Sequence, residues 1–334
     1  MQNKTNDQMY NAGWKIRFIQ ETATTQASID NMRSVFTRTA AYERQWDADL
    51  ATKTIDELMP MIDAVCGIRV RTRTARISML RRYSRWCIDN HMPGAKEIPA
   101  GERFVSTGAI RGRLVRNPEH LQYQLNKIFD AESELTQDNV YRAFFWLAYG
   151  GMGKDRAYNL KVGDIRFEYM EAQCETDDGF EIAVLYRQGV AAIRNCVTLT
   201  AFKYKNQSYT NAGDIWRDRV TGNRLLRGIR EDQALSNFNT QISRKLRIKR
   251  EEGIEATELS YDKVWLSGMF YRTYEQELAG IEPDFTELIC HSEYGRRALA
   301  SCPPGRRQIV FNDLLARSGY QLDYINWKKM IVEA

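Results

Sequence analysis

Seven arginines lie within one short stretch of the chain, and no acidic residue lies among them. They are Arg69, Arg71, Arg73, Arg76, Arg81, Arg82 and Arg85. A guanidinium forms paired hydrogen bonds with a phosphate, and each phosphate neutralised releases counterions from a duplex. The alternative is a solvated helix face, but such a face normally mixes acidic with basic residues. The stretch therefore predicts contact with a nucleic-acid backbone.

Two further groups of cations lie in the second half of the chain. One group consists of Arg244, Lys245, Arg247, Lys249 and Arg250, and the other of Arg296, Arg297, Arg306 and Arg307 around a Pro-Pro-Gly turn. Cations at the end of a helix also complement its dipole, which is the structural alternative for the first group. The net charge of +5 averages over these clusters. Basic clusters in both halves predict a clamp around duplex DNA.

Other chemistries lack the residues they need. The six cysteines are widely spaced and only three histidines are present, so neither a zinc site nor a disulfide framework is expected. The sequence contains no glycine-rich phosphate loop and no nucleophile elbow. We therefore expect no metal and no cofactor. No apolar run approaches the length of a membrane span and the amino terminus is polar, which predicts a cytoplasmic protein without membrane contact.

The first part of the chain reads as a compact helical domain. Apolar residues at helical spacing predict helices at 26–38 and 54–66, from Thr72 to the breakers Pro93 and Gly94, and after Pro118. The polar residues before them predict an arm. The expected organisation is an arm over 1–25, a helical DNA-binding domain over 26–132 and a second domain over 133–334.

The second domain is expected to combine helices with one small antiparallel sheet. An apolar helix at 140–149 ends at Gly150 and Gly151, and a short helix at 155–160 follows it. Alternating or β-branched segments predict three strands, at 164–169, 181–186 and 196–202. Helices are expected again at 232–251, 261–278, 308–316 and 322–332. The predicted fold class is mainly α with a small antiparallel β-sheet.

The segment from Phe144 to Ile165 resembles the tyrosine recombinases, the phage integrase family. Its apolar helix is followed by Gly151-Met152, then by Asn159-Leu160-Lys161 and by Asp164-Ile165. The order of the predicted elements fits that family over nearly the whole chain. The resemblance implies an N-terminal core-binding domain of the SAM-like type and a catalytic-type α+β domain. It also implies double-stranded DNA as the partner.

The resemblance further implies a set of catalytic residues, from which this sequence departs. The family's first arginine falls on Gly153 and its acidic position on Arg156. The hairpin lysine would be Lys203 or Lys205. In the family's His-x-x-Arg helix, one register gives Ser267 and Phe270 and the other gives Met269 and Arg272, so each loses a catalytic residue. Tyr324, with Tyr320 behind it, is the candidate nucleophile, although the two tyrosines also have the spacing of core residues. The remaining catalytic candidates are therefore Arg156, Lys205, Arg272 and Tyr324.

Three hypotheses follow for the function. The leading one is a sequence-specific duplex-binding protein that has lost strand exchange and acts by occupancy, similar to the integrase-fold repressors of temperate phages. Its DNA contacts would come from the arginines at 69–85 and the cations at 244–250. The second is an active, divergent recombinase that forms a phosphotyrosine. The third is a helical protein-interaction module with incidental basic patches. The first also predicts a homo-oligomer on DNA, a regulatory peptide or protein as a partner, and a place in the host cytoplasm or nucleoid if the protein is phage-encoded.

Overall fold

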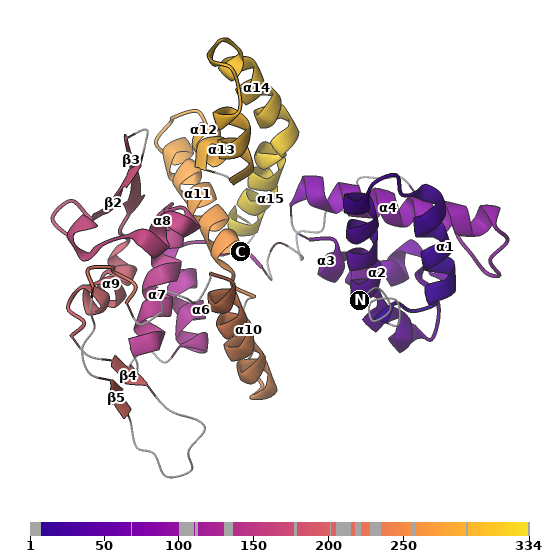
Figure 1. The fold of residues 1–334 in the computed structure, drawn as a ribbon, viewed down its shortest axis with the longest axis horizontal. Helices are drawn as coiled ribbons and strands as arrows, with labels where there is room; N and C mark the ends of the chain where they lie inside the picture. Colours follow the sequence, from indigo (N-terminus) through magenta and orange to yellow (C-terminus); the bar gives the residue numbers. More distant parts are fainter. Residues whose placement is uncertain are drawn as a thin grey trace. The chain divides into compact units, whose positions relative to one another are not determined.

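The chain divides into two compact units in this computed structural model (Figure 1). Unit 1 comprises Met1–Ile110 and Ala316–Asn326, and unit 2 comprises Arg111–Leu315 and Trp327–Ala334. One short segment near the end of the chain, Ala316–Asn326, therefore belongs to unit 1, and the residues after it belong to unit 2. The structure describes residues 8–67, 69–99, 110, 113–129, 136–176, 179–200, 202–204, 215–217, 222–227, 235–254, 258–291 and 293–332.

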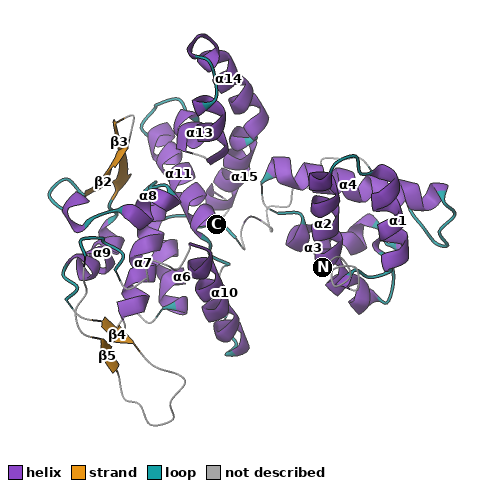
Figure 2. Cartoon of the chain, in the orientation of Figure 1, coloured by secondary structure: helices purple, strands orange, loops and turns teal. Residues whose placement is uncertain are grey.

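Unit 1 is built of helices (Figure 2). They pack around an aromatic centre. Phe18, Phe36 and Tyr83 meet edge to face there, with ring centroids 4.9 to 6.0 Å apart. Each such pair contributes about 0.5–1.5 kcal/mol beyond the area that it buries. This packing fixes which face of the arginine-rich helix α4 points outward. The helices are α1 (Ala12–Thr22), α2 (Gln26–Trp46), α3 (Ile55–Val65) and α4 (Val70–Asp89), with a 3-10 turn at Leu50–Thr52 between α2 and α3.

Helix α1 belongs to the core of unit 1, which differs from the expected polar arm over residues 1–25. Phe18 and Ile19 bury its apolar face. Lys15 is also buried, and its Nζ lies 2.6 Å from Glu43 Oε1 and 3.2 Å from Asp49 Oδ2. Tyr83 donates to the same Asp49 oxygen at 2.9 Å. A buried charge is tolerated when it is paired in this way, and the sequence signal was missed because Lys15 interrupts the apolar pattern.

Unit 2 is built around α7 (Thr136–Tyr149), which is buried on all sides from Val140 onward. α11 (Tyr261–Leu278) and α9 (Val190–Val197) pack against it. Gly268 allows the close crossing with α11, since a Cβ at this position would lie 1.9 Å from the Tyr149 carbonyl oxygen. The other described helices that lie wholly in unit 2 are α6 (Pro118–Ile128), α8 (Lys154–Asn159), α10 (Leu235–Glu251), α12 (Thr286–His291) and α13 (Glu293–Ala300), with 3-10 turns at Val162–Asp164, Arg187–Gly189 and Pro304–Arg306. Helices α14 (Arg307–Ser318) and α15 (Tyr320–Val332) are divided between the units, because Ala316–Asn326 belongs to unit 1.

A three-stranded antiparallel sheet lies beside α7 in unit 2. Its order is β1-β2-β3, with β1 at Ile165–Arg166, β2 at Glu171–Thr176 and β3 at Gly179–Val184. The register pairs Cys174 with Glu181. A separate antiparallel pair is formed by β4 (Phe202–Tyr204) and β5 (Ile215–Arg217). The predicted fold class, mainly α with a small antiparallel sheet, is confirmed.

One predicted strand is wrong and one strand was not predicted. Residues 190–197 form α9, so the strand expected at 196–202 is wrong except where β4 begins at Phe202. Ala192, Ile193 and Cys196 bury one helical face, and this face outweighs the β-branched residues that follow. The middle strand β2 was not predicted, because only the small residues Ala172 and Cys174 turn inward between polar neighbours.

The units also divide elsewhere than at residue 132. α6 was expected in the first domain but packs in unit 2, where it contacts α10. Among the described helices, none is both long enough and apolar enough to cross a membrane.

Candidate functional site

One face of α4 combines exposed arginines with small residues. Residues 71, 75, 78, 82 and 85 follow one another at steps of four or three, so they share one helix face, and all are exposed. Ala75 and Ser78 are short and lie between Arg71 and the pair Arg82–Arg85. A phosphate backbone can therefore approach the helix axis closely between cations. We call this face the α4 stripe; its members are Arg71, Ala75, Ser78, Arg82 and Arg85.

The other arginines of the predicted cluster contact the protein itself. Arg73 is 3% exposed and pairs with Asp63. Arg76 Nη1 donates to the Val65 carbonyl oxygen at 2.7 Å, and burial together with the neighbouring Arg38 lowers the pKa of Arg76. Arg81 Nε donates to the Ile98 carbonyl oxygen at 3.1 Å. These side chains fasten α4 to unit 1, whereas the stripe arginines are exposed. Arg85 Nη1 lies 3.2 Å from Glu97 Oε1 in a pair that is exposed on both sides.

Arg69 joins the start of α4 to the returning C-terminal segment. Its Nε donates to Asp323 Oδ2 at 2.5 Å, its Nη2 to the Ser318 carbonyl oxygen at 3.0 Å, and its guanidinium stacks 4.1 Å from the ring centroid of Tyr320. Asp323 Oδ1 also accepts the backbone N–H of Val70 at 2.7 Å, so Asp323 caps a helix whose N-cap residue, Arg69, makes no side-chain capping bond. Burial raises the pKa of Asp323, although Arg69 opposes this effect.

The two candidate nucleophiles, Tyr320 and Tyr324, lie in the same C-terminal segment as Asp323. Tyr320 is 5% exposed and Tyr324 is 3% exposed. A nucleophile that attacks a phosphate needs an accessible hydroxyl. Both tyrosines belong to unit 1, whereas Arg156 and Arg272 belong to unit 2.

The cations of α10 divide in the same way as those of α4. Lys245 contacts Asp138 and lies 5.1 Å from the ring centroid of Phe129, which ties α10 to the unit 2 core. Lys249 pairs with Glu252 at 2.7 Å. Arg244, Arg247 and Arg250 are exposed at steps of three residues, and Arg247 Nε lies 3.7 Å from the exposed Glu251 Oε1. Arg306 and Arg307 are exposed as well, while the side chains of Arg296 and Arg297 lie outside the described part of the chain.

The resemblance places an arginine in the turn after α7, but the backbone groups of this turn are hydrogen-bonded to other side chains of the protein. The backbone N–H of Gly153 donates to Glu181 Oε1, and Glu181 is 5% exposed. Tyr261 donates to the Met152 carbonyl oxygen at 2.7 Å and Trp265 to that of Gly151 at 2.9 Å. The position therefore presents a glycine next to a buried carboxylate, which would repel a phosphate.

Arg156 and Arg272 both lie close to this turn. Arg156 Nε is 4.0 Å from Glu181 Oε2 and its side chain is partly exposed. Arg272 Nη1 donates to the Tyr149 carbonyl oxygen at 2.7 Å, and its Nη2 contacts Met269 Sδ. The structure thus brings these two candidates to one turn. Lys205 lies outside the described residues, and Lys203 is described only as a backbone position of β4, paired with Trp216.

The other register of the expected His-x-x-Arg helix falls in the core. Ser267 Oγ accepts the Val115 N–H at 2.9 Å and donates to the Lys263 carbonyl oxygen at 2.8 Å. Phe270 is fully buried against Trp327, with ring centroids 5.9 Å apart. Neither side chain can act on a substrate in this position.

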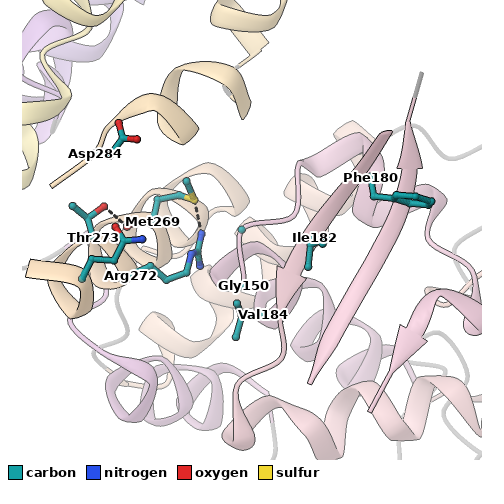
Figure 3. A pocket seen from close by; sticks show the side chains of 10 residues that line it. Gly150, Phe180, Ile182, Val184, Met269, Arg272, Thr273 and Asp284 are labelled. Atoms are coloured by element: carbon teal, nitrogen blue, oxygen red, sulfur yellow. Dashed lines mark hydrogen bonds between the residues drawn. The ribbon is translucent and has the colours of Figure 1, made fainter. Parts of the chain in front are cut away.

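A cavity of about 420 Å³ opens between β3 and α11 (Figure 3). Of the four catalytic candidates, only Arg272 is among its described lining residues. Burial and Glu275 raise the pKa of the nearby Tyr271 to about 12, so this tyrosine stays protonated at neutral pH. No group of metal-ligating side chains occurs among the described residues. The lining residues are Gly150, Gly151, Phe180, Ile182, Val184, Met269, Arg272, Thr273, Gln276 and Asp284.

Replacing Gly151 by alanine should destabilise this cavity wall. Gly151 has a φ of +106°, and a Cβ there would lie 2.5 Å from Arg272 Nη2. We expect the free energy of unfolding to fall by about 1–3 kcal/mol, measured by urea denaturation. Gly163→Ala is the matched control, because nothing lies within 4 Å of its added Cβ. Equal stability of the two variants would contradict the proposed close approach.

Sequence reasoning missed three parts of the site. It did not single out Glu181, because an acidic residue on a strand normally points outward. It also did not distinguish the α4 stripe from the arginines that face the protein, although the steps of three and four residues were available as a signal. The cap that Asp323 provides for α4 spans a sequence separation of 253 residues, for which no local signal exists.

A family model matches the helices of unit 1 from α1 to α4. Residues 9–89 match the family model described as "MrpR, N-terminal core-binding domain". These residues form a core-binding domain. The match covers α1 to α4 and includes the α4 stripe, and it bears out the predicted resemblance to the tyrosine recombinases for this domain. No curated protein gives a significant sequence match.

Solved structures of recombinases and integrases resemble the chain at low similarity. The XerA recombinase has a TM-score of 0.35 at 12% identity, over 88% of this chain and 96% of that one. The Tn1549 transposon integrase in complex with circular intermediate DNA has a TM-score of 0.33 at 11% identity, over 88% and 100%. A lambda integrase dimer bound to a core site has a TM-score of 0.32 at 13% identity, over 85% and 96%.

Proposed function

We propose that this protein binds duplex DNA through the core-binding domain and acts by occupying its site, as a transcriptional repressor does, without strand exchange. The observation that carries the proposal is the α4 stripe, which presents three exposed arginines on one face of a core-binding domain. Exposed arginines of α10 supply further phosphate contacts from unit 2. Affinity for a duplex comes mainly from such contacts.

The turn after α7 supports the loss of cleavage. Phosphoryl transfer needs cations at the phosphate to stabilise the charge that develops on it, and one such donor contributes about 3 kcal/mol or more. Here a glycine stands at the first arginine position, and its N–H is taken by the buried Glu181. Binding and cleavage are separable, because the stripe lies on unit 1 and this turn on unit 2.

A second candidate function, an active divergent recombinase, draws support from Arg272. Its guanidinium lines the cavity beside Gly151. The resemblance implies that Arg156, Lys205 and Tyr324 would act with it in that function. Self-association on DNA and a regulatory partner belong to the first proposal, as does a cytoplasmic location.

A covalent-capture experiment separates the two functions. On a nicked duplex that traps cleaved intermediates, taken from the DNA flanking the protein's own gene, we expect a salt-sensitive complex and no covalent adduct. Tyr324→Phe should leave affinity within about twofold, since the ring and its packing remain. An adduct that disappears in Tyr324→Phe would establish the recombinase. Absence of duplex binding even at low ionic strength would instead favour a protein-interaction module.

A further inference from the structure

The outer face of β3 carries apolar side chains, although the exposed face of a strand is normally polar. Phe180, Ile182 and Val184 are 62%, 49% and 40% exposed, while Glu181 and Ala183 between them are buried. The three apolar side chains therefore share one face. All three line the cavity, and Figure 3 shows Ile182 and Val184 on one side of it with Met269 and Arg272 on the other.

β3 is also an edge strand with unpaired backbone groups. It lies at the end of the order β1-β2-β3, so within the described chain only β2 pairs with it as a strand. Val184 donates its N–H away from β2, to the Gly150 carbonyl oxygen at 3.0 Å. Hydrogen-bonding direction alternates along a strand, so the N–H and C=O groups of Phe180 and Ile182 point the same way. Natural proteins usually cover such an edge or place charged side chains on it. Here the outward side chains of the edge strand, Phe180, Ile182 and Val184, are apolar.

Arg272 gives the cavity a site for an anion. Its guanidinium is partly buried. Among the described residues it forms no ion pair, although Glu275 is near enough to interact with its charge and Asp284 lines the same cavity. Its contacts with the Tyr149 carbonyl oxygen and Met269 Sδ hold the group at the cavity wall. A partly buried guanidinium forms a strong, charge-assisted hydrogen bond with a carboxylate. A ligand that also carries apolar groups next to its carboxylate would fit this cavity.

We propose that β3 and α11 bind an extended peptide that carries apolar side chains at alternate positions and one carboxylate. The peptide adds to the sheet as a fourth strand beside β3, pairs with the backbone of Phe180 and Ile182, and packs its apolar side chains on Phe180, Ile182 and Val184. Its carboxylate pairs with Arg272. Backbone pairing supplies affinity and the alternate side chains supply specificity.

DNA is the less favoured occupant of this surface. β2 places Glu171 and Glu175 directly opposite Val184 and Phe180 on the same face of the hairpin. Phosphates would approach these carboxylates and three apolar side chains, with Arg272 as the cation. A peptide instead satisfies the edge, the apolar face and the cation together. The proposal depends on unit 2 alone, so it stands independently of DNA binding by the α4 stripe.

Fluorescence anisotropy with synthetic peptides tests the proposal on the full chain. The probes are fluorescein-labelled six-residue peptides, as long as β3, with alternate positions mixed among Val, Ile, Leu and Phe and one remaining position fixed as Asp. We expect saturable binding, and about tenfold or greater weakening when Asp is replaced by Asn. Methylating alternate backbone nitrogens should abolish binding in one register and spare it in the other.

Variants of the protein complete the test. Ile182→Lys changes an exposed side chain and should remove binding. Arg272→Gln should weaken binding of the Asp peptide by about tenfold or more and make the Asp and Asn peptides bind alike. Tyr169→Ser is the matched control, since Tyr169 is an exposed aromatic outside the cavity lining and should leave binding unchanged. Arg82→Ala should also leave peptide binding unchanged. The proposal is overturned if no peptide binds, if Asp and Asn peptides bind equally, if both methylated registers bind, or if Ile182→Lys abolishes only self-association or only DNA binding.

Discussion

Replacing Arg71, Arg82 and Arg85 together by alanine is expected to weaken binding to duplex DNA by about 100-fold or more at physiological salt. Each arginine of the α4 stripe is exposed and can form a charge-assisted hydrogen bond with a phosphate. Each lost phosphate contact should also make the dependence of log affinity on log salt less steep by about 0.9. Anisotropy titrations over a series of salt concentrations measure both quantities.

The matched control removes the same charge from the same domain. Arg17, Arg38 and Arg44 are exposed on α1 and α2. Their triple alanine variant has the same net charge as the stripe variant, so it isolates position from total charge. We expect its affinity to fall by less than about fivefold, because these side chains lie off the α4 stripe, and exposed charges that make no direct phosphate contact are screened by salt. Equal losses in the two variants would show that net charge, and not the stripe, carries binding.

Replacing Asp323 by alanine is expected to destabilise unit 1 by about 2–4 kcal/mol. The change removes the only acceptor shown for the Val70 N–H, which costs about 1 kcal/mol as a lost helix cap. It also leaves Arg69 partly buried without its carboxylate, and breaking such a pair adds to the cost. Hydrogen exchange of the first turn of α4 should accelerate, and the urea midpoint should fall.

Two further variants show which contact matters. Asp323→Asn keeps an acceptor for the helix cap but removes the charge opposite Arg69, so it should recover part of the lost stability. Glu97→Gln is the control, because its pair with Arg85 is exposed on both sides and contributes less than about 1 kcal/mol. Unchanged exchange at the start of α4 in Asp323→Ala would rule out the capping role.

Local sequence patterns predicted where the helices and strands lie better than they predicted which residues these elements bring into contact. The apolar run that ends at Gly150 and Gly151 gave α7 and its turn, because hydrophobic residues and a helix stop act over a few residues. Residues 196–202 were misassigned because burial of Ala192 and Cys196 is decided by α7, which is distant in sequence. The arginine cluster was visible as composition. Its division into Arg73, which is buried, and Arg82, which is exposed, depends on how α4 packs.

The candidate cleavage site shows the same limit. The departure at Gly153 is readable in the sequence, but the carboxylate that takes its N–H comes from β3 and depends on the register of the hairpin. Glu181 is inward because this bond satisfies it. A rule that places charges at the surface therefore puts it on the wrong face of the strand.

The segment Ala316–Asn326 gives unit 1 an unusual order of assembly during synthesis. Most of unit 1 leaves the ribosome early, and at about 5–20 residues per second the cap for α4 follows more than ten seconds later, since Asp323 lies 253 residues beyond Val70. Until then the first turn of α4 has its N–H groups exposed to water and Arg69 without its carboxylate. Translation that stops before residue 316 would leave the first turn of α4 uncapped. The capped form of this helix can therefore exist only in chains in which nearly all of unit 2 has already been synthesised.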